Sequence, residues 1–83
     1  MGVAVKQSAY SASGIADLYA QHRDLLWGLV YRLTGDAAEA EDIVQETFVR
    51  AMTRPPSDTD RSWRPWLVQV ALNLGRDLLR RRR

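Results

Sequence analysis

The chain has 83 residues, enough for one small domain, and its 46% apolar and 27% charged residues are typical of a globular protein rather than a disordered one. It has no cysteine and one histidine, which excludes disulfides and thiolate metal sites and argues against a histidine-based catalytic centre. The net charge of +2 conceals an asymmetry, because residues 1–60 carry five Lys and Arg against nine Asp and Glu, whereas residues 61–83 carry seven Arg against one Asp. This division indicates two different partner surfaces, and the four final arginines favour a polyanion.

The first stretch of the chain is small and polar without a sustained period, so we expect a flexible segment over 1–13 and a folded domain over 14–83. It does not resemble a secretory signal, and no apolar stretch approaches the length of a membrane span. We therefore expect a cytoplasmic protein with no membrane partner. Because the sequence contains no Gly-rich phosphate loop and no nucleophile elbow, we expect no enzymatic activity, no metal and no cofactor.

The first predicted helix covers Gly14 to Thr34, where apolar residues recur at the i, i+3, i+4, i+7 spacing of an amphipathic helix. Ser13 is placed to cap its start, and Gly35 falls where a left-handed residue commonly ends a helix. The predicted buried stripe, with His22 as a packed core histidine, is Ile15, Leu18, Tyr19, His22, Leu25, Leu26, Leu29, Val30 and Leu33.

The second predicted helix covers Ala37 to Thr53. Asp36 can cap it, with Glu39 three residues later as a carboxylate variant of the capping box, and Pro55 and Pro56 follow its end. Its predicted buried stripe is Ala40, Ile43, Val44, Thr47, Phe48 and Ala51.

The opposite side of this helix carries what we call the acidic strip, which consists of Asp42, Gln45, Glu46 and Val49. Such a strip repels DNA and is usually only a solubilising surface. An apolar side chain among polar ones is, however, a mild mark of a protein–protein contact.

Residues 54–62 read as a turn-rich loop, after which Ser62 can cap a third helix that tolerates Pro65 in its first turn. The predicted buried stripe of this helix is Trp63, Trp66, Leu67, Val70, Ala71, Leu74 and Leu78. No segment shows a sustained period of two, so the fold class predicted is all-α, a compact three-helix domain.

The side of the third helix away from this stripe is the polar face, which consists of Gln69, Asn73, Arg76 and Arg80. Gln, Asn and Arg can make paired hydrogen bonds to base edges, and arginine also binds phosphate. An ordinary solvated face is the alternative for any one of them, but no Glu or Lys interrupts the face, and the combination favours nucleic acid. A membrane-surface helix fits poorly, because this helix lacks lysine and its apolar stripe is needed for the core.

Three further residues near the start of the third helix, Arg61, Trp63 and Arg64, are also candidates for nucleic-acid contact. Trp63 could stack on an unpaired base or pack in the core, whereas Trp66 is expected to be mostly core. Asp77 flanks the buried side of the helix, and we expect it to pair with an arginine of the first helix such as Arg32.

Two motifs in this order resemble region 2 of bacterial sigma-70 family factors, specifically the extracytoplasmic function (ECF) group. They are AEDIVQETF, from Ala40 to Phe48, and WLVQVALNLGRD, from Trp66 to Asp77, and the resemblance extends from about Ile15 to Arg83. It implies that the acidic strip residues Asp42, Gln45 and Glu46 dock on the coiled coil of the RNA polymerase β′ subunit. It also implies that the last helix and the preceding loop bind the non-template strand of the promoter −10 element, with Asn73 contacting a base.

The resemblance therefore implies a transcription-initiation factor domain whose partners are RNA polymerase core and single-stranded promoter DNA. The alternative is a protein-interaction domain whose main partner is an anti-sigma factor. Members of this family also carry a helix-turn-helix region 4, which is absent from these 83 residues, so we expect the chain to be part of a longer protein.

Overall fold

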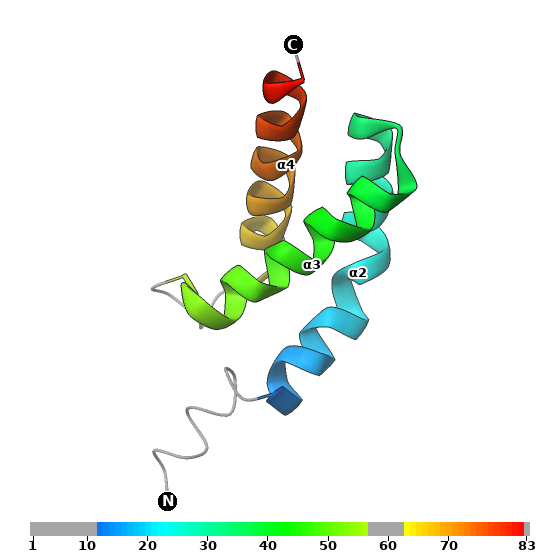
Figure 1. Cartoon of the computed structure of the whole chain (residues 1–83). Helices are drawn as coiled ribbons and strands as arrows, with labels where there is room; N and C mark the ends of the chain where they lie inside the picture. The colour runs from blue at the N-terminus through cyan, green and yellow to red at the C-terminus, as the bar shows by residue number, and fades with distance from the viewer. Residues whose placement is uncertain (1–11, 57–62, 83) are drawn as a thin grey trace, which may run out of the picture.

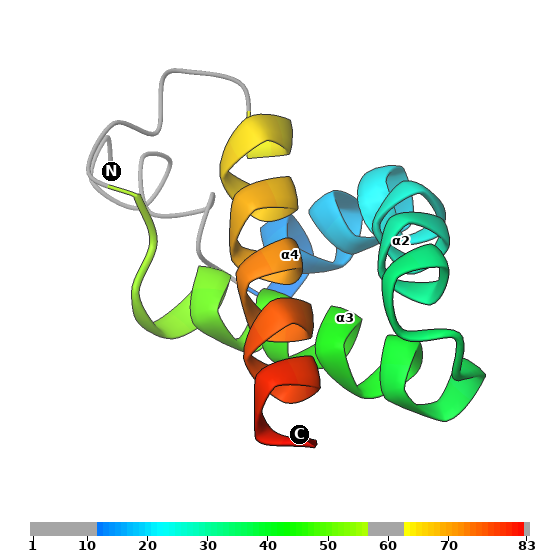
Figure 2. The same ribbon diagram turned by 90° about the horizontal axis from the view of Figure 1, so that it is seen from above.

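The computed structural model describes residues 12–56 and 63–82, and every regular element in those ranges is a helix. The elements are α2 (Ala12–Thr34), α3 (Ala37–Thr53) and α4 (Trp63–Arg81). Each helix contacts the other two, and α3 runs across both α2 and α4 (Figures 1 and 2). The predicted all-α, compact three-helix fold is confirmed.

The turn between α2 and α3 has the predicted chemistry. Gly35 adopts a φ of 72°, a left-handed conformation that glycine takes without steric cost, and its N–H donates to the carbonyl oxygen of Tyr31 at 2.7 Å. Asp36 then caps α3, since its carboxylate accepts from the Glu39 N–H at 3.0 Å. This short connection sets α3 back across α2.

Two predicted caps differ from the structure. α2 begins at Ala12, so Ser13 lies inside the helix rather than at its cap, because alanine and serine extend a helix at little cost. The Glu39 side chain does not complete a capping box: the Asp36 N–H donates to the Thr34 hydroxyl at 3.3 Å, and the Glu39 carboxylate pairs instead with Arg82, which directly follows α4. Ser62, the cap predicted for α4, lies outside the described residues.

The core forms where the three helices meet. Leu26 and Val30 of α2, Val44 of α3 and Leu67 of α4 are fully buried. All six residues of the predicted α3 stripe are buried, including Thr47, whose hydroxyl donates to the carbonyl oxygen of Ile43 at 2.8 Å.

The other two predicted stripes are too wide. Leu25 is 39% exposed, because the buried line of α2 follows Leu26 and Val30. Trp66 and Val70 of α4 are only half-buried, and the buried line of that helix runs instead through Leu67, Ala71 and Gly75. Ala71 and Gly75 are small and allow α4 to approach its neighbours closely, which hydropathy alone does not reveal.

Gly75 of α4 packs closely against the Leu33 side chain of α2. A Cβ added there would lie 2.7 Å from Leu33 Cδ2 and 4.0 Å from Ile43 Cδ1. The first distance is shorter than real Cβ contacts, so any larger residue must displace the Leu33 side chain.

His22 of α2 is a core histidine, as predicted, with 9% of its surface exposed. Its Nδ1 is buried and has no hydrogen-bond partner among the described residues. Burial, and then the nearby positive charge of Arg64, lowers the pKa of His22 below 6.5 because both disfavour the imidazolium.

No helix within residues 12–56 and 63–82 is both long and apolar enough to cross a bilayer. The same residues contain no cluster of three or more His, Cys, Asp or Glu side chains arranged to hold a metal ion.

The burial pattern predicts different costs for two truncations that hydropathy treats alike. Leu26→Ala removes a fully buried side chain and should lower the free energy of unfolding by about 2–5 kcal/mol. Val70→Ala, at a half-buried position, should cost about 1 kcal/mol or less. Urea denaturation followed by circular dichroism measures both, and equal losses would contradict the assigned helix phases.

The lowered pKa of His22 predicts a pH-dependent stability. In the unfolded chain the His22 imidazole is protonated near pH 6.5, whereas in the folded protein it is protonated only at a lower pH. The contribution of neutral His22 to the free energy of unfolding is therefore fully present above pH 6.5 and is lost as the pH falls below that value. The melting temperature should therefore fall between about pH 7 and about pH 5.5, and His22→Leu should reduce that fall. An identical pH dependence in wild type and variant would show that His22 is not the responsible group.

Candidate nucleic-acid interface

The polar face of α4 is presented to solvent. Gln69, Asn73, Arg76 and Arg80 are all exposed, whereas Leu67 and Ala71 on the opposite side are buried. Gln69 and Arg80 lie roughly 16 Å apart along the axis at 1.5 Å per residue, a length that can follow several nucleotides of a strand. The structure thus gathers these four predicted residues on one accessible surface.

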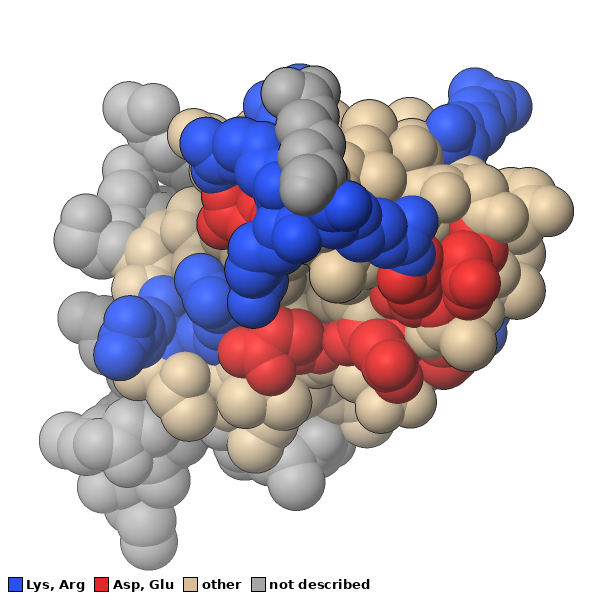
Figure 3. Space-filling view, turned by 45° about the horizontal axis from the view of Figure 1, so that its top comes forward, with Lys and Arg blue, Asp and Glu red and all other residues tan. Residues whose placement is uncertain are grey.

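Basic side chains crowd the C-terminal end of α4, with acidic side chains directly beside them (Figure 3). Arg80, Arg81 and Arg82 are exposed there. An exposed guanidinium cluster attracts phosphate and makes nucleic-acid binding sensitive to salt.

The start of α4 carries two tryptophans in edge-to-face contact, with the rings of Trp63 and Trp66 centred 5.7 Å apart at 90°. Both are half-buried and pack against the core, so part of the Trp63 surface stays accessible beside the exposed Arg64. Arg61, predicted with them, lies outside the described residues.

The acidic strip lies on α3 and is exposed along its whole length, from Asp42 through Gln45 and Glu46 to Val49. Val49 is 48% exposed, and Met52, one turn further and absent from the sequence prediction, is 53% exposed. The i, i+3 spacing of Val49 and Met52 places both on one side of the helix and could have indicated Met52 from the sequence. The strip therefore ends in an apolar patch that a protein partner can cover.

A polar network behind the strip orients Gln45. The Glu41 carboxylate accepts from Arg23 of α2 at 2.7 Å and from the Gln45 side-chain amide at 3.4 Å. Arg23 also donates to the Tyr19 hydroxyl at 3.1 Å, and the Tyr19 ring packs edge-on against Phe48 with centroids 4.9 Å apart. The Tyr19 hydrogen bond and then the Glu41 charge raise the pKa of Arg23 above its ordinary value. Since the network joins two helices, sequence periodicity did not reveal it.

Asp77 does not pair with Arg32, contrary to the sequence prediction. It pairs with Arg80 one turn along α4, because residues three apart on a helix are neighbours. Arg32 is exposed in the last turn of α2 and lines a small hollow on that helix with Asp24, Leu25, Gly28 and Leu29. Asp77 thus partly neutralises an arginine of the polar face rather than joining two helices.

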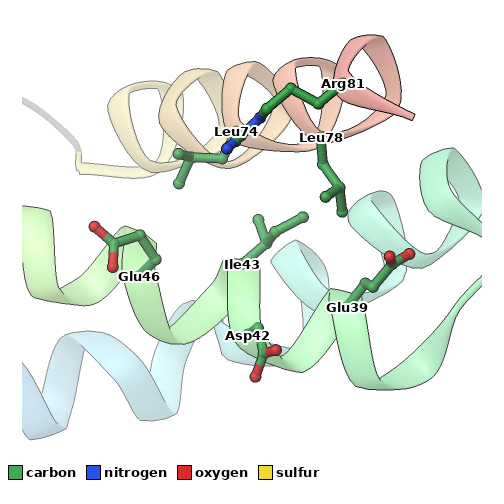
Figure 4. A pocket seen from close by; sticks show the side chains of 7 residues that line it. All are labelled: Glu39, Asp42, Ile43, Glu46, Leu74, Leu78 and Arg81. Carbon is green, nitrogen blue, oxygen red and sulfur yellow. The ribbon is translucent and has the colours of Figure 1, made fainter. Parts of the chain in front are cut away.

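A groove of about 420 Å³ separates the acidic strip from the arginine end of α4. Ile43, Leu74 and Leu78 form its apolar part, Glu39, Asp42 and Glu46 line it from α3, and Arg81 lines it from α4. Figure 4 shows Glu39 and Ile43 directed toward α4, whereas the Asp42 carboxylate points away from it. The acidic strip and the arginine end of α4 therefore meet at this groove, and Glu39 spans it through its ion pair with Arg82.

Comparison with known proteins identifies one family. The family described as Sigma-70 region 2 matches residues 18–83. The ECF RNA polymerase sigma factor SigL of Mycobacterium tuberculosis is 48% identical over 69 residues, covering 81% of this chain and 39% of SigL. SigW of Bacillus subtilis is 39% identical over 69 residues (82% of this chain, 37% of SigW), and BldN of Streptomyces coelicolor is 35% identical over 79 residues (93% and 30%). The chain thus spans well under half the length of these relatives. No solved structure gave a significant match.

Proposed function

This chain belongs to the sigma-70 region 2 family, and from that premise we propose that it serves transcription initiation by binding RNA polymerase core and promoter DNA through separate surfaces. The acidic strip of α3 docks on the coiled coil of the β′ subunit. The polar face of α4 binds the non-template strand of the −10 element.

The observation that carries this proposal is the separation of charge between two exposed surfaces of one small domain. α3 presents Asp42 and Glu46, and the end of α4 presents Arg80 to Arg82. A polyanion is repelled by the first surface and attracted by the second, so one domain can hold a basic protein and DNA together.

The chemistry of the polar face supports recognition of bases in single-stranded DNA. Asn73 offers both a donor and an acceptor on a short side chain, which suits one base edge, and Gln69 lies one turn before it. Trp63 offers aromatic surface for base stacking at the start of the helix, where Arg64 can meet phosphate.

The acidic strip supports docking on a protein. Its charged residues set the orientation of a basic partner, while Val49 and Met52 provide apolar area whose burial contributes affinity. The link from Tyr19 through Arg23 and Glu41 holds Gln45 in place before the partner arrives.

Charge reversal in the strip tests the docking surface. Glu46→Lys should weaken binding to the isolated β′ coiled coil by about tenfold or more, because like charges then face each other across the contact. Asp17→Lys, the same charge change at an exposed position of α2, is the matched control and should have little effect. Surface plasmon resonance measures both, with circular dichroism to verify the fold, and equal affinities for the two variants would place docking elsewhere.

Two substitutions on α4 separate base reading from phosphate binding. Asn73→Ala should lower discrimination between a −10 non-template oligonucleotide and a scrambled one, since a good base contact contributes about 1–3 kcal/mol. Arg80→Ala should weaken both oligonucleotides equally and reduce the salt slope by about 0.7 for each phosphate that the variant no longer neutralises.

The measurement for both variants is a salt titration of oligonucleotide binding in the presence of polymerase core. Equal losses of affinity on the two oligonucleotides for Asn73→Ala would assign it a role in packing or backbone contact. A loss of affinity confined to the −10 sequence for Arg80→Ala would extend base reading further along α4.

A further inference from the structure

Glu39 has a role that helix capping does not explain. It lies in the first turn of α3, yet its carboxylate is directed across the groove, where one oxygen pairs with the Arg82 guanidinium. The other oxygen, Oε1, is buried and has no hydrogen-bond partner among the described residues. A partly buried carboxylate with one unpaired oxygen depends on its cation, because removing the cation would leave the charge uncompensated.

Arg81 lies on the same side of α4. Its side chain runs back along the helix toward Leu74 (Figure 4), and its Nε donates to the Asp77 carbonyl oxygen at 3.4 Å. It therefore faces the groove that Glu39 and Glu46 line from α3. Arg82 is thus paired with α3, and Arg81 lies beside it at the groove.

We propose that Glu39 and Arg82, with Arg81 beside them, form an arginine latch that keeps part of the basic end of α4 from DNA. The proposal rests on the proposed function only in taking DNA as the polyanion that α4 binds. The Arg82 charge that Glu39 compensates attracts a phosphate less strongly, so full use of this guanidinium by DNA requires the ion pair to break.

The latch also connects the two binding surfaces. A basic group that docks beside Asp42 and Glu46 competes with the arginines for the negative potential of α3 and thereby favours their release. By linkage, DNA that takes up the arginines leaves these carboxylates more available to a basic partner, so each ligand strengthens the other.

The expected effect is modest. The Arg82 and Glu39 side chains are 42% and 25% exposed, and ion pairs that reach solvent contribute little. Breaking the latch should therefore tighten DNA binding by about two- to fivefold at low salt, and less at high salt where the pair is screened.

Fluorescence anisotropy of labelled oligodeoxythymidine, which has no −10 sequence, tests the latch. Glu39→Gln should tighten binding by about two- to fivefold. Asp24→Asn is the matched control. It also removes one negative charge, but from an exposed residue of α2 that does not line the groove, so it should change affinity less. Glu39→Asp keeps the charge but shortens its reach, so it should also tighten binding, and it replaces Glu39→Gln if that variant fails to fold by circular dichroism.

A double-mutant cycle with Arg82→Ala gives the decisive comparison. Because Arg82 is released in the Glu39→Gln background, Arg82→Ala should cost more affinity there than in the wild type. Equal gains for Glu39→Gln and Asp24→Asn, or an additive cycle, would overturn the latch. Failure of every variant to bind the oligonucleotide would overturn the latch and the DNA half of the proposed function. If the cycle is non-additive but the protein does not dock on the β′ coiled coil, the latch stands and only the docking half of the proposed function is overturned.

Discussion

The close approach of α4 to the other two helices is the constraint on which the rest of the structure depends. Leu67 and Ala71 are buried against α2 and α3, and at Gly75 even one added carbon would collide with Leu33. A larger residue at Gly75 would have to displace the Leu33 side chain. Small residues on one side of α4 thus fix the position of the polar face on the other.

In a domain this small each helix buries one side in the core and exposes the other. The side of α3 opposite the core becomes the acidic strip, and the side of α4 opposite the core becomes the polar face. The Arg23–Glu41 ion pair at 2.7 Å links α2 to α3 just behind Gln45. The same packing that stabilises the fold therefore presents both candidate binding surfaces in a fixed relation.

Electrostatics at the groove add an interaction between these surfaces. The acidic residues of α3 and the arginines of α4 lie on opposite edges, and Glu39 bridges them through Arg82. Opposite charges at such an edge attract within the domain whenever no partner is present, and the attraction weakens as salt screens it. On the function proposed above, this attraction would make the free domain a weaker DNA binder than its arginine content alone suggests.

Helix positions, the Gly35 turn, the Asp36 cap and the exposed acidic and polar surfaces follow from the sequence, because periodicity and local backbone chemistry act over a few neighbouring residues. The partners of Glu39 and Glu41 were decided only by the tertiary structure, whereas the i, i+3 spacing of Asp77 and Arg80 already allowed their pairing. Glu39 and Glu41 meet arginines from other helices, and Asp77 pairs with its own neighbour rather than with the distant Arg32. The exposure of Leu25 and the burial of Gly75 likewise depend on how closely the helices approach one another, a distance that no single helix specifies.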